Sequence, residues 1–162
     1  MKVKVHYLFS RNKKIGSRLI AWGTKHLTSI KTTPSHIAIL VNERWVHEST
    51  LETGVRVISY KKWKEINEEV EKVPCIHKYR DYDEIKKIYQ SIKDKKYDWS
   101  GVIYLGIFLA LNKIFGVKIP EKNKWEKPNR YFCCEAVEKM TDLGPASMKA
   151  PVQILHEWTD NG

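Results

Sequence analysis

The chain has 162 residues, of which 42% are hydrophobic and 30% charged, and these values fit one folded domain rather than a disordered or disulfide-stapled protein. We therefore expect a single domain over residues 1–162. The formal net charge of +10 comes mainly from lysines spread along the chain, which is typical of a solvated surface. We expect no nucleic-acid partner, and at most a weak contact with an anionic membrane surface.

The first half of the chain predicts an antiparallel sheet. Apolar and polar residues alternate over residues 3–9, which favours a strand, and apolar residues at helical spacing follow at residues 15–24. After a polar loop at residues 28–35, three short runs predict a meander of strands at residues 36–41, 44–48 and 54–60.

The second half predicts mainly helices, so we expect the α+β class. Periodicity indicates helices at residues 61–70, 83–93 and 97–111, a strand at residues 73–77, and a last helix from Cys133 to about residue 142. Residues 113–128 form a lysine-rich connection without a regular pattern, which is long for a compact domain. Such a connection is either mobile or part of a site.

Location is suggested by what the sequence lacks. The N-terminal residues do not contain the uninterrupted apolar core of a signal peptide, and the longest apolar run, residues 102–111, is about half the length of a membrane-spanning helix. Three cysteines, an odd number, predict reduced thiols. We expect a cytoplasmic protein, although delivery by a phage or another route would leave the same sequence.

Two of the cysteines, Cys133 and Cys134, are adjacent at the predicted start of the last helix. A cysteine attacks as its thiolate, which both a helix N-terminus and a nearby histidine favour. Helical spacing puts Cys133 on one stripe with Ala136, Val137 and Met140, so Cys133 faces the body of the fold and Cys134 is a packing or half-exposed neighbour. Two small apolar core residues are the alternative interpretation of this motif alone.

Among the six histidines, His36 has the most distinctive context. It stands between a polar loop and the most hydrophobic strand, so its ring can lie at the rim of a sheet and serve a thiol as base. A third group, His47 or Glu48, should orient the ring. A two-residue hairpin loop puts His47 on the face of His36, whereas a three-residue loop, residues 42–44, puts Glu48 there. The pattern leaves both registers open.

Other chemistries find little support in the sequence. No cysteine or histidine pair has metal-ligand spacing, and no glycine-rich phosphate loop, nucleotide fingerprint or serine elbow motif is present. We expect neither a metal nor a cofactor.

Several segments in a fixed order resemble the circularly permuted papain-like hydrolases related to the NlpC peptidases. SRLIAWGT at residues 17–24, SHIAIL at 35–40, WVHES at 45–49 and GVRV at 54–57 resemble the first half of that family. YDW at residues 97–99, before an apolar helix, and YFCCEAV at 131–137 resemble the second half. The resemblance extends over residues 5–154, including Ala150-Pro151 after the expected last helix.

The resemblance implies a permuted papain-like fold, in which an antiparallel sheet or partial barrel packs against helices and the nucleophile opens a C-terminal helix. It implies Cys133 as nucleophile, His36 as general base and Glu48 as the orienting residue, and hence a hairpin loop longer than two residues. Tyr97 and Cys134 become candidates for the cleft or the oxyanion side, and Cys134 stands where the family often has serine.

The implied reaction is cleavage of an amide, for example a peptide of the peptidoglycan type, or of a lipid acyl bond, through a thioester intermediate. A lipid acyl hydrolase or acyltransferase of the same fold is one alternative. The other is a non-catalytic basic module that binds nucleic acid or another polyanion, because a fold does not by itself establish function.

Overall fold

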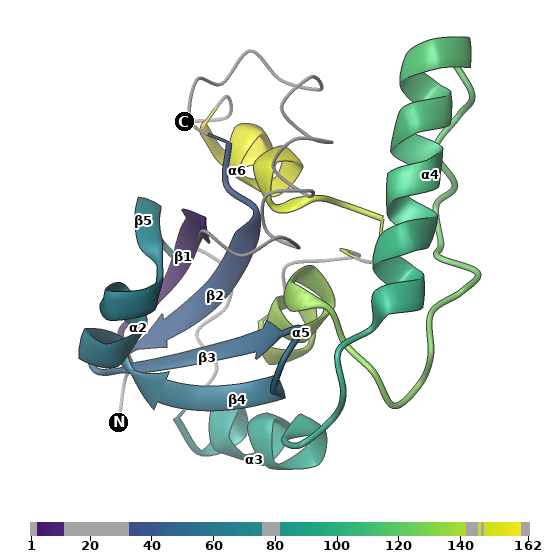
Figure 1. The fold of residues 1–162 in the computed structure, drawn as a ribbon. Coiled ribbons are helices and arrows are strands. Elements are labelled where there is room, and N and C mark those ends of the chain that lie inside the picture. Colours follow the sequence, from purple (N-terminus) through teal and green to yellow (C-terminus); the bar gives the residue numbers. More distant parts are fainter. Residues whose placement is uncertain (1–2, 12–32, 76–81, 142–145, 147, 160–162) are drawn as a thin grey trace.

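The computed structural model describes residues 3–11, 33–75, 82–141, 146 and 148–159. These residues form a five-stranded antiparallel sheet with five helices, which confirms the predicted α+β class (Figure 1). The helix expected at residues 15–24 lies outside the described residues. Within the described ranges, no helix combines the length and apolar character needed to cross a bilayer.

The sheet has the strand order β4-β3-β2-β1-β5, with antiparallel neighbours throughout. The strands are β1 (Val5–Arg11), β2 (His36–Val41), β3 (Trp45–Thr50), β4 (Gly54–Ser59) and β5 (Glu68–Pro74). The predicted meander, β2-β3-β4, is confirmed. All six residues of β2 are buried, as expected for an apolar central strand.

The edge strand β5 takes the place of part of a predicted helix. The helix expected at residues 61–70 is α2 (Tyr60–Ile66), which ends early, and β5 then begins at Glu68 rather than at residue 73. Glutamate and lysine have high helix propensity, so the segment was predicted as helix. In the structure they are the charged side chains of an edge strand. A Glu68–Arg11 ion pair, Oε1 to Nη2 2.7 Å, joins the start of β5 to the end of β1.

Four more helices follow: α3 (Tyr82–Ile92), α4 (Trp99–Phe115), α5 (Cys133–Met140) and α6 (Pro151–Thr159). The predicted end of α4 at residue 111 is wrong, because the helix continues to Phe115 and closes at Gly116 in the left-handed conformation, φ 68°. Helix α6 was not predicted from the sequence. It opens with a proline, a residue suited to the first position of a helix.

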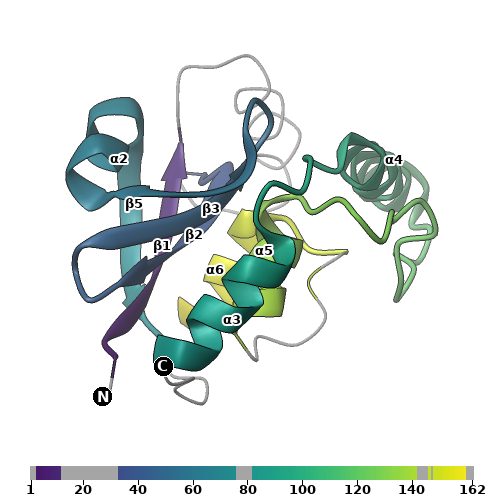
Figure 2. The same ribbon diagram turned by 90° about the horizontal axis from the view of Figure 1, so that it is seen from below.

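Helices cover both faces of the sheet (Figure 2). Helix α2 covers one face, where a small cluster contains Leu8, Ala38, Leu40, Val46 and Trp63. Helices α3, α5 and α6 cover the other face and form the main core with the odd-numbered residues of β1 and β2. The start of α5, with Cys133, thus lies against the central strands.

Helix α4 stands beside this layered body (Figure 1). One side of it packs against the segment that leads into α6, in a cluster of Tyr104, Leu105, Leu109, Met148, Ala150 and Val152. The connection at residues 116–132 is irregular, as predicted, and runs back along the helix. Asn123 fixes it there, because its Nδ2 donates to the carbonyl of Gly101 (2.9 Å).

Candidate active site

The hairpin loop between β2 and β3 determines which residue faces His36. The register pairs Ile39 with His47, which leaves the three residues 42–44 as the loop. This confirms the expectation of a loop longer than two residues. Because side chains alternate along a strand, Glu48 lies on the face of His36 and His47 on the opposite face.

His47 is therefore separated from His36. Its ring packs edge-on against Tyr89 of α3, with ring centroids 5.2 Å apart. Burial lowers the pKa of His47 to about 4, so the ring is neutral near pH 7, and its Nδ1 has no hydrogen-bond partner among the described residues. Of the two alternatives that the sequence left open, only Glu48 reaches His36.

Glu48 is the centre of a buried polar network, with 1% of its surface exposed. Its Oε2 accepts from His36 Nε2 (2.9 Å) and Trp63 Nε1 (3.1 Å), and its Oε1 accepts from Arg56 Nε (2.8 Å) and Nη2 (2.6 Å). Burial alone would raise the pKa of Glu48, but the hydrogen bonds and positive charges of His36 and Arg56 lower it to about 2. The carboxylate is therefore ionised and has a donor at each lone-pair direction.

His36 links this network to Cys133. A carboxylate only accepts, so His36 Nε2 donates to Glu48, and the ring is also hydrogen-bonded to the Cys133 thiol. Burial by itself lowers the pKa of His36, but the hydrogen bonds to Cys133 and Glu48 and their negative charges raise it to about 10. His36 is the first residue of β2, so its ring lies at the end of the strand, where it can meet a group from the far face of the sheet.

Cys133 is the first residue of α5 and has 3% of its surface exposed. The preceding residue, Phe132, caps the helix, and its N–H donates to Glu135 Oε2 (3.0 Å). A hydrogen bond from Cys134 is the largest influence on the pKa of the Cys133 thiol. Burial opposes it, whereas the His36 imidazole and the N–H of Ile37 reinforce it, and the pKa lies well below its usual value.

Cys134 is wholly buried, so of the two expected alternatives, a packing neighbour or a half-exposed one, the structure shows the packing neighbour. Its Sγ lies 3.9 Å from Cys133 Sγ, and neither residue forms a disulfide. Burial and the adjacent Cys133 raise the pKa of Cys134 well above its usual value. The pair therefore divides into a thiolate acceptor and a thiol donor.

The start of α5 is held from two sides. Tyr131 N–H donates to the carbonyl of Lys96 (3.1 Å), and Ser49 Oγ donates to the carbonyl of Tyr131 (2.6 Å). Ser49 directly follows Glu48 on β3, so one strand carries both the carboxylate and this contact to the segment that precedes Cys133.

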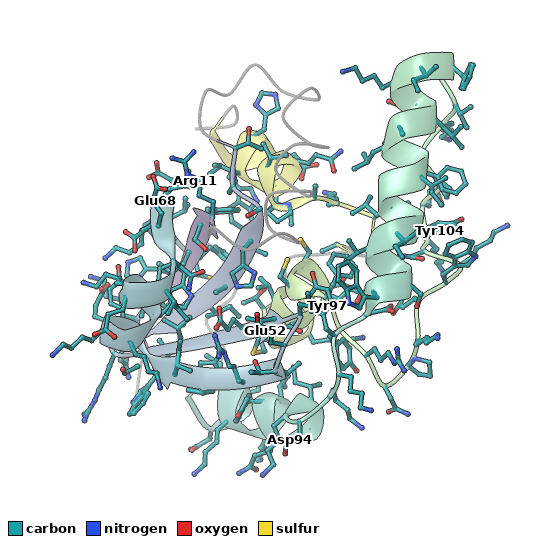
Figure 3. The ribbon with its side chains drawn as sticks, in the orientation of Figure 1. Arg11, Glu52, Glu68, Asp94, Tyr97 and Tyr104 are labelled. Atoms are coloured by element: carbon teal, nitrogen blue, oxygen red, sulfur yellow. The ribbon has the colours of Figure 1, made fainter. Side chains whose placement is uncertain are left out.

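Tyr97 lies beside both cysteines. Figure 3 shows it at the base of α4, where that helix approaches α5. Burial raises the pKa of Tyr97 well above its usual value, and the negative charge of Cys133 adds to this effect. The predicted site residues His36, Glu48, Cys133, Cys134 and Tyr97 are therefore all found in one place.

Three contributors were missed by sequence reasoning. Arg56 lies directly opposite Glu48 in the β3–β4 pairing, so the alternating pattern of GVRV contained a signal for it. Trp63 and Ser49 carried no such signal, because one comes from the separate helix α2 and the other acts through its hydroxyl on a distant carbonyl.

Among the described residues, no cluster of three or more histidine, cysteine, aspartate or glutamate side chains is arranged to hold a metal ion. Comparison of the chain with protein-family models, curated proteins and solved structures found no match.

Proposed function

We propose that the protein is a cysteine hydrolase of the permuted papain-like type, which cleaves an amide or acyl bond through a thioester on Cys133. The observation that carries this proposal is the placement of one imidazole, His36, in hydrogen bonds with both the Cys133 thiol and the Glu48 carboxylate. A thiolate, a base and a group that orients the base are the parts that such a reaction needs.

In the first half of the reaction the Cys133 thiolate attacks the substrate carbonyl carbon, and the carbonyl electrons move onto its oxygen. The N–H groups in the first turn of α5, which point out of the helix end, stabilise this oxyanion, a contribution of about 3 kcal/mol at comparable sites. As the tetrahedral intermediate collapses, protonated His36 gives its proton to the departing amine or alcohol, which leaves the acyl group on sulfur.

In the second half water attacks the thioester. His36, now neutral, takes a proton from the water, and the acid product leaves as the thiolate re-forms. Glu48 stays ionised throughout and holds the Nε2 proton of His36, so the other ring nitrogen faces the sulfur. Arg56 and Trp63 keep the Glu48 carboxylate in that position.

Thiol labelling tests the proposal. The protein is treated with iodoacetamide between pH 5 and 9, and the labelled cysteine is identified by peptide mapping. We expect Cys133 to react in the folded protein and to keep its rate at mildly acidic pH, because its pKa is lowered. A structural cysteine would react only after unfolding, which is the expected behaviour if the protein is a non-catalytic basic module.

Two histidine variants sharpen the measurement. His36→Gln removes the imidazole beside the thiol, whereas His47→Gln removes a similarly buried imidazole from the neighbouring strand without touching that contact. We expect H36Q to slow labelling of Cys133 near pH 6 by at least about tenfold, since an ordinary thiol is mostly protonated there. H47Q should label like the wild type. Equal rates in both variants would refute the assignment of His36 as base.

A further inference from the structure

The exposed side of α4 is an unusual surface. Six exposed positions on one face of the helix carry only apolar residues, and we call them the apolar stripe: Trp99, Ile103, Gly106, Ile107, Ala110 and Ile114. The opposite side of the same helix packs into the cluster with Met148 and Val152. A helix that is apolar on all sides is normally buried on all sides, so the stripe has the composition of a surface that is covered in use.

The segment that contains the stripe is strongly basic. Residues 93–130 contain nine lysines and arginines against four aspartates and glutamates, so this stretch, less than a quarter of the chain, carries +5 of the net charge of +10. The single charged residue within α4 is Lys113, next to Ile114 of the stripe. The connection that follows runs back along α4, held by Asn123 near the helix start and by Asn112, whose Nδ2 donates to the carbonyl of Val117 (2.9 Å), near the helix end. The connection has four exposed lysines, Lys118, Lys122, Lys124 and Lys127, and it carries them along the length of the helix.

We propose that the apolar stripe of α4 docks on an anionic lipid surface, with the helix lying in the membrane interface and the flanking lysines contacting lipid headgroups. Apolar residues on one helix face with lysines beside them are the features of helices that lie in this interface. A second copy of the chain is a poorer occupant, because pairing two stripes brings together two segments of the same strong positive charge.

Exposed aromatic residues support the same orientation. Trp99 opens the stripe and is 40% exposed, and Trp125 of the connection is 49% exposed beside it, where Ser100 Oγ donates to the carbonyl of Trp125 (3.2 Å). Tryptophan is the residue enriched at the boundary between lipid and water. Trp99 also packs edge-on against Tyr97, with centroids 5.9 Å apart, so a docked α4 brings the lipid surface next to the candidate active site.

Vesicle flotation of the full chain tests the docking. We use vesicles of phosphatidylcholine alone and vesicles with about one third phosphatidylglycerol. We expect the protein to float with the anionic vesicles, to remain in solution with the neutral ones, and to lose binding at about 0.5 M salt, because salt screens the lysines. The measurement does not depend on catalysis, so its failure leaves the proposed hydrolase intact, and the reverse also holds.

Two variants connect the binding to the stripe. Ile103→Ser with Ile107→Ser replaces side chains that are 51% and 43% exposed, whereas Ile66→Ser replaces one that is 46% exposed at the end of α2. The wild type buries both isoleucines in the membrane, and the double variant loses this apolar contact. We therefore expect its partition coefficient to fall by at least about tenfold, and that of I66S to be unchanged. Circular dichroism checks that both variants are folded.

Three results would overturn the proposal: no flotation of the wild type with anionic vesicles, flotation of the double variant equal to that of the wild type, or a stripe-dependent dimer that ignores vesicles. The second result would assign the binding to lysines elsewhere, and the third would make a second copy of the chain the occupant.

Discussion

Replacing Glu48 by glutamine disturbs the buried network with the least change in shape. One carboxylate oxygen becomes an NH2 group, which can only donate. Each oxygen accepts two hydrogen bonds, from His36 and Trp63 on one side and from Arg56 on the other. In either orientation of the amide, the NH2 group therefore faces two donors that have lost their acceptor.

The expected loss is large. Lowering the pKa of Glu48 from 4.5 to about 2 corresponds to on the order of 3 kcal/mol of folding free energy. Removing one partner of a buried ion pair costs about 3–5 kcal/mol in other proteins, which agrees with this figure. We expect Glu48→Gln to lower the free energy of unfolding by about 3 kcal/mol at pH 7, where the carboxylate is ionised.

The effect should depend on pH. The pKa of Glu48 in the folded state lies below its ordinary value of 4.5, so its stabilisation is complete above that value and is lost as the pH falls toward 2. The difference between wild type and variant therefore shrinks below about pH 4. His47, whose pKa is lowered to about 4, also makes the folded state less stable as the pH falls from 6.5, but both chains share this loss.

Urea denaturation followed by tryptophan fluorescence at pH 7 and about pH 3 measures the effect. Glu43→Gln is the matched control, because it makes the same chemical change in an exposed ion pair, Glu43 Oε2 to Lys72 Nζ 3.1 Å, and should cost less than about 1 kcal/mol. An E48Q variant that is no more destabilised than E43Q, or whose loss of stability is undiminished at low pH, would contradict this role of the Glu48 carboxylate.

Four further variants probe residues near Cys133 and the start of β4. Ser49→Ala removes the hydrogen bond to the carbonyl of Tyr131. We expect the free energy of unfolding in urea to fall by about 1 kcal/mol and the labelling of Cys133 to slow. Unchanged values in both assays would contradict the role of Ser49 in holding this segment. Cys134→Ala should raise the pKa of Cys133 and slow its labelling near pH 6, while Cys134→Ser, which keeps a donor, should label faster than the alanine variant. Gly54→Ala should lower the free energy of unfolding by about 2–4 kcal/mol, because φ there is 65° and a Cβ would lie 2.0 Å from a backbone carbonyl oxygen. Wild-type stability in urea would show that this close approach can relax.

Much of the candidate site could be predicted because it depends on local patterns. The stripe of Cys133 with Ala136, Val137 and Met140 follows from helical spacing, and all four residues are buried as expected. Register is different. The three-residue loop has positive φ at Asn42 and Glu43, and glutamate rarely adopts this conformation. The loop residues therefore gave no signal for the register, and the face of Glu48 could not be decided from them.

Prediction failed where the local preference and the tertiary environment disagree. Residues 68–74 contain helix-forming glutamate and lysine, yet they are a strand because β1 offers an unpaired edge. Helix α6 was overlooked although its signal was present. Pro151 stands at the first position, and the side chain of Gln153 accepts a hydrogen bond from the N–H of Ala150 (2.8 Å), as at other helix starts.

The hydrogen bond from Ser49 to Tyr131 joins residues 82 positions apart in the sequence, and this separation has a consequence for biosynthesis. Contacts between residues so far apart form more slowly than local ones, so we expect the start of α5 to meet β3 after the hairpins of the sheet have formed. Until then Cys133 has no imidazole beside it and behaves as an ordinary thiol, mostly protonated at neutral pH. We therefore expect a nascent or partly folded chain to lack the enhanced reactivity of Cys133. The onset of rapid labelling at mildly acidic pH would then report that folding is complete.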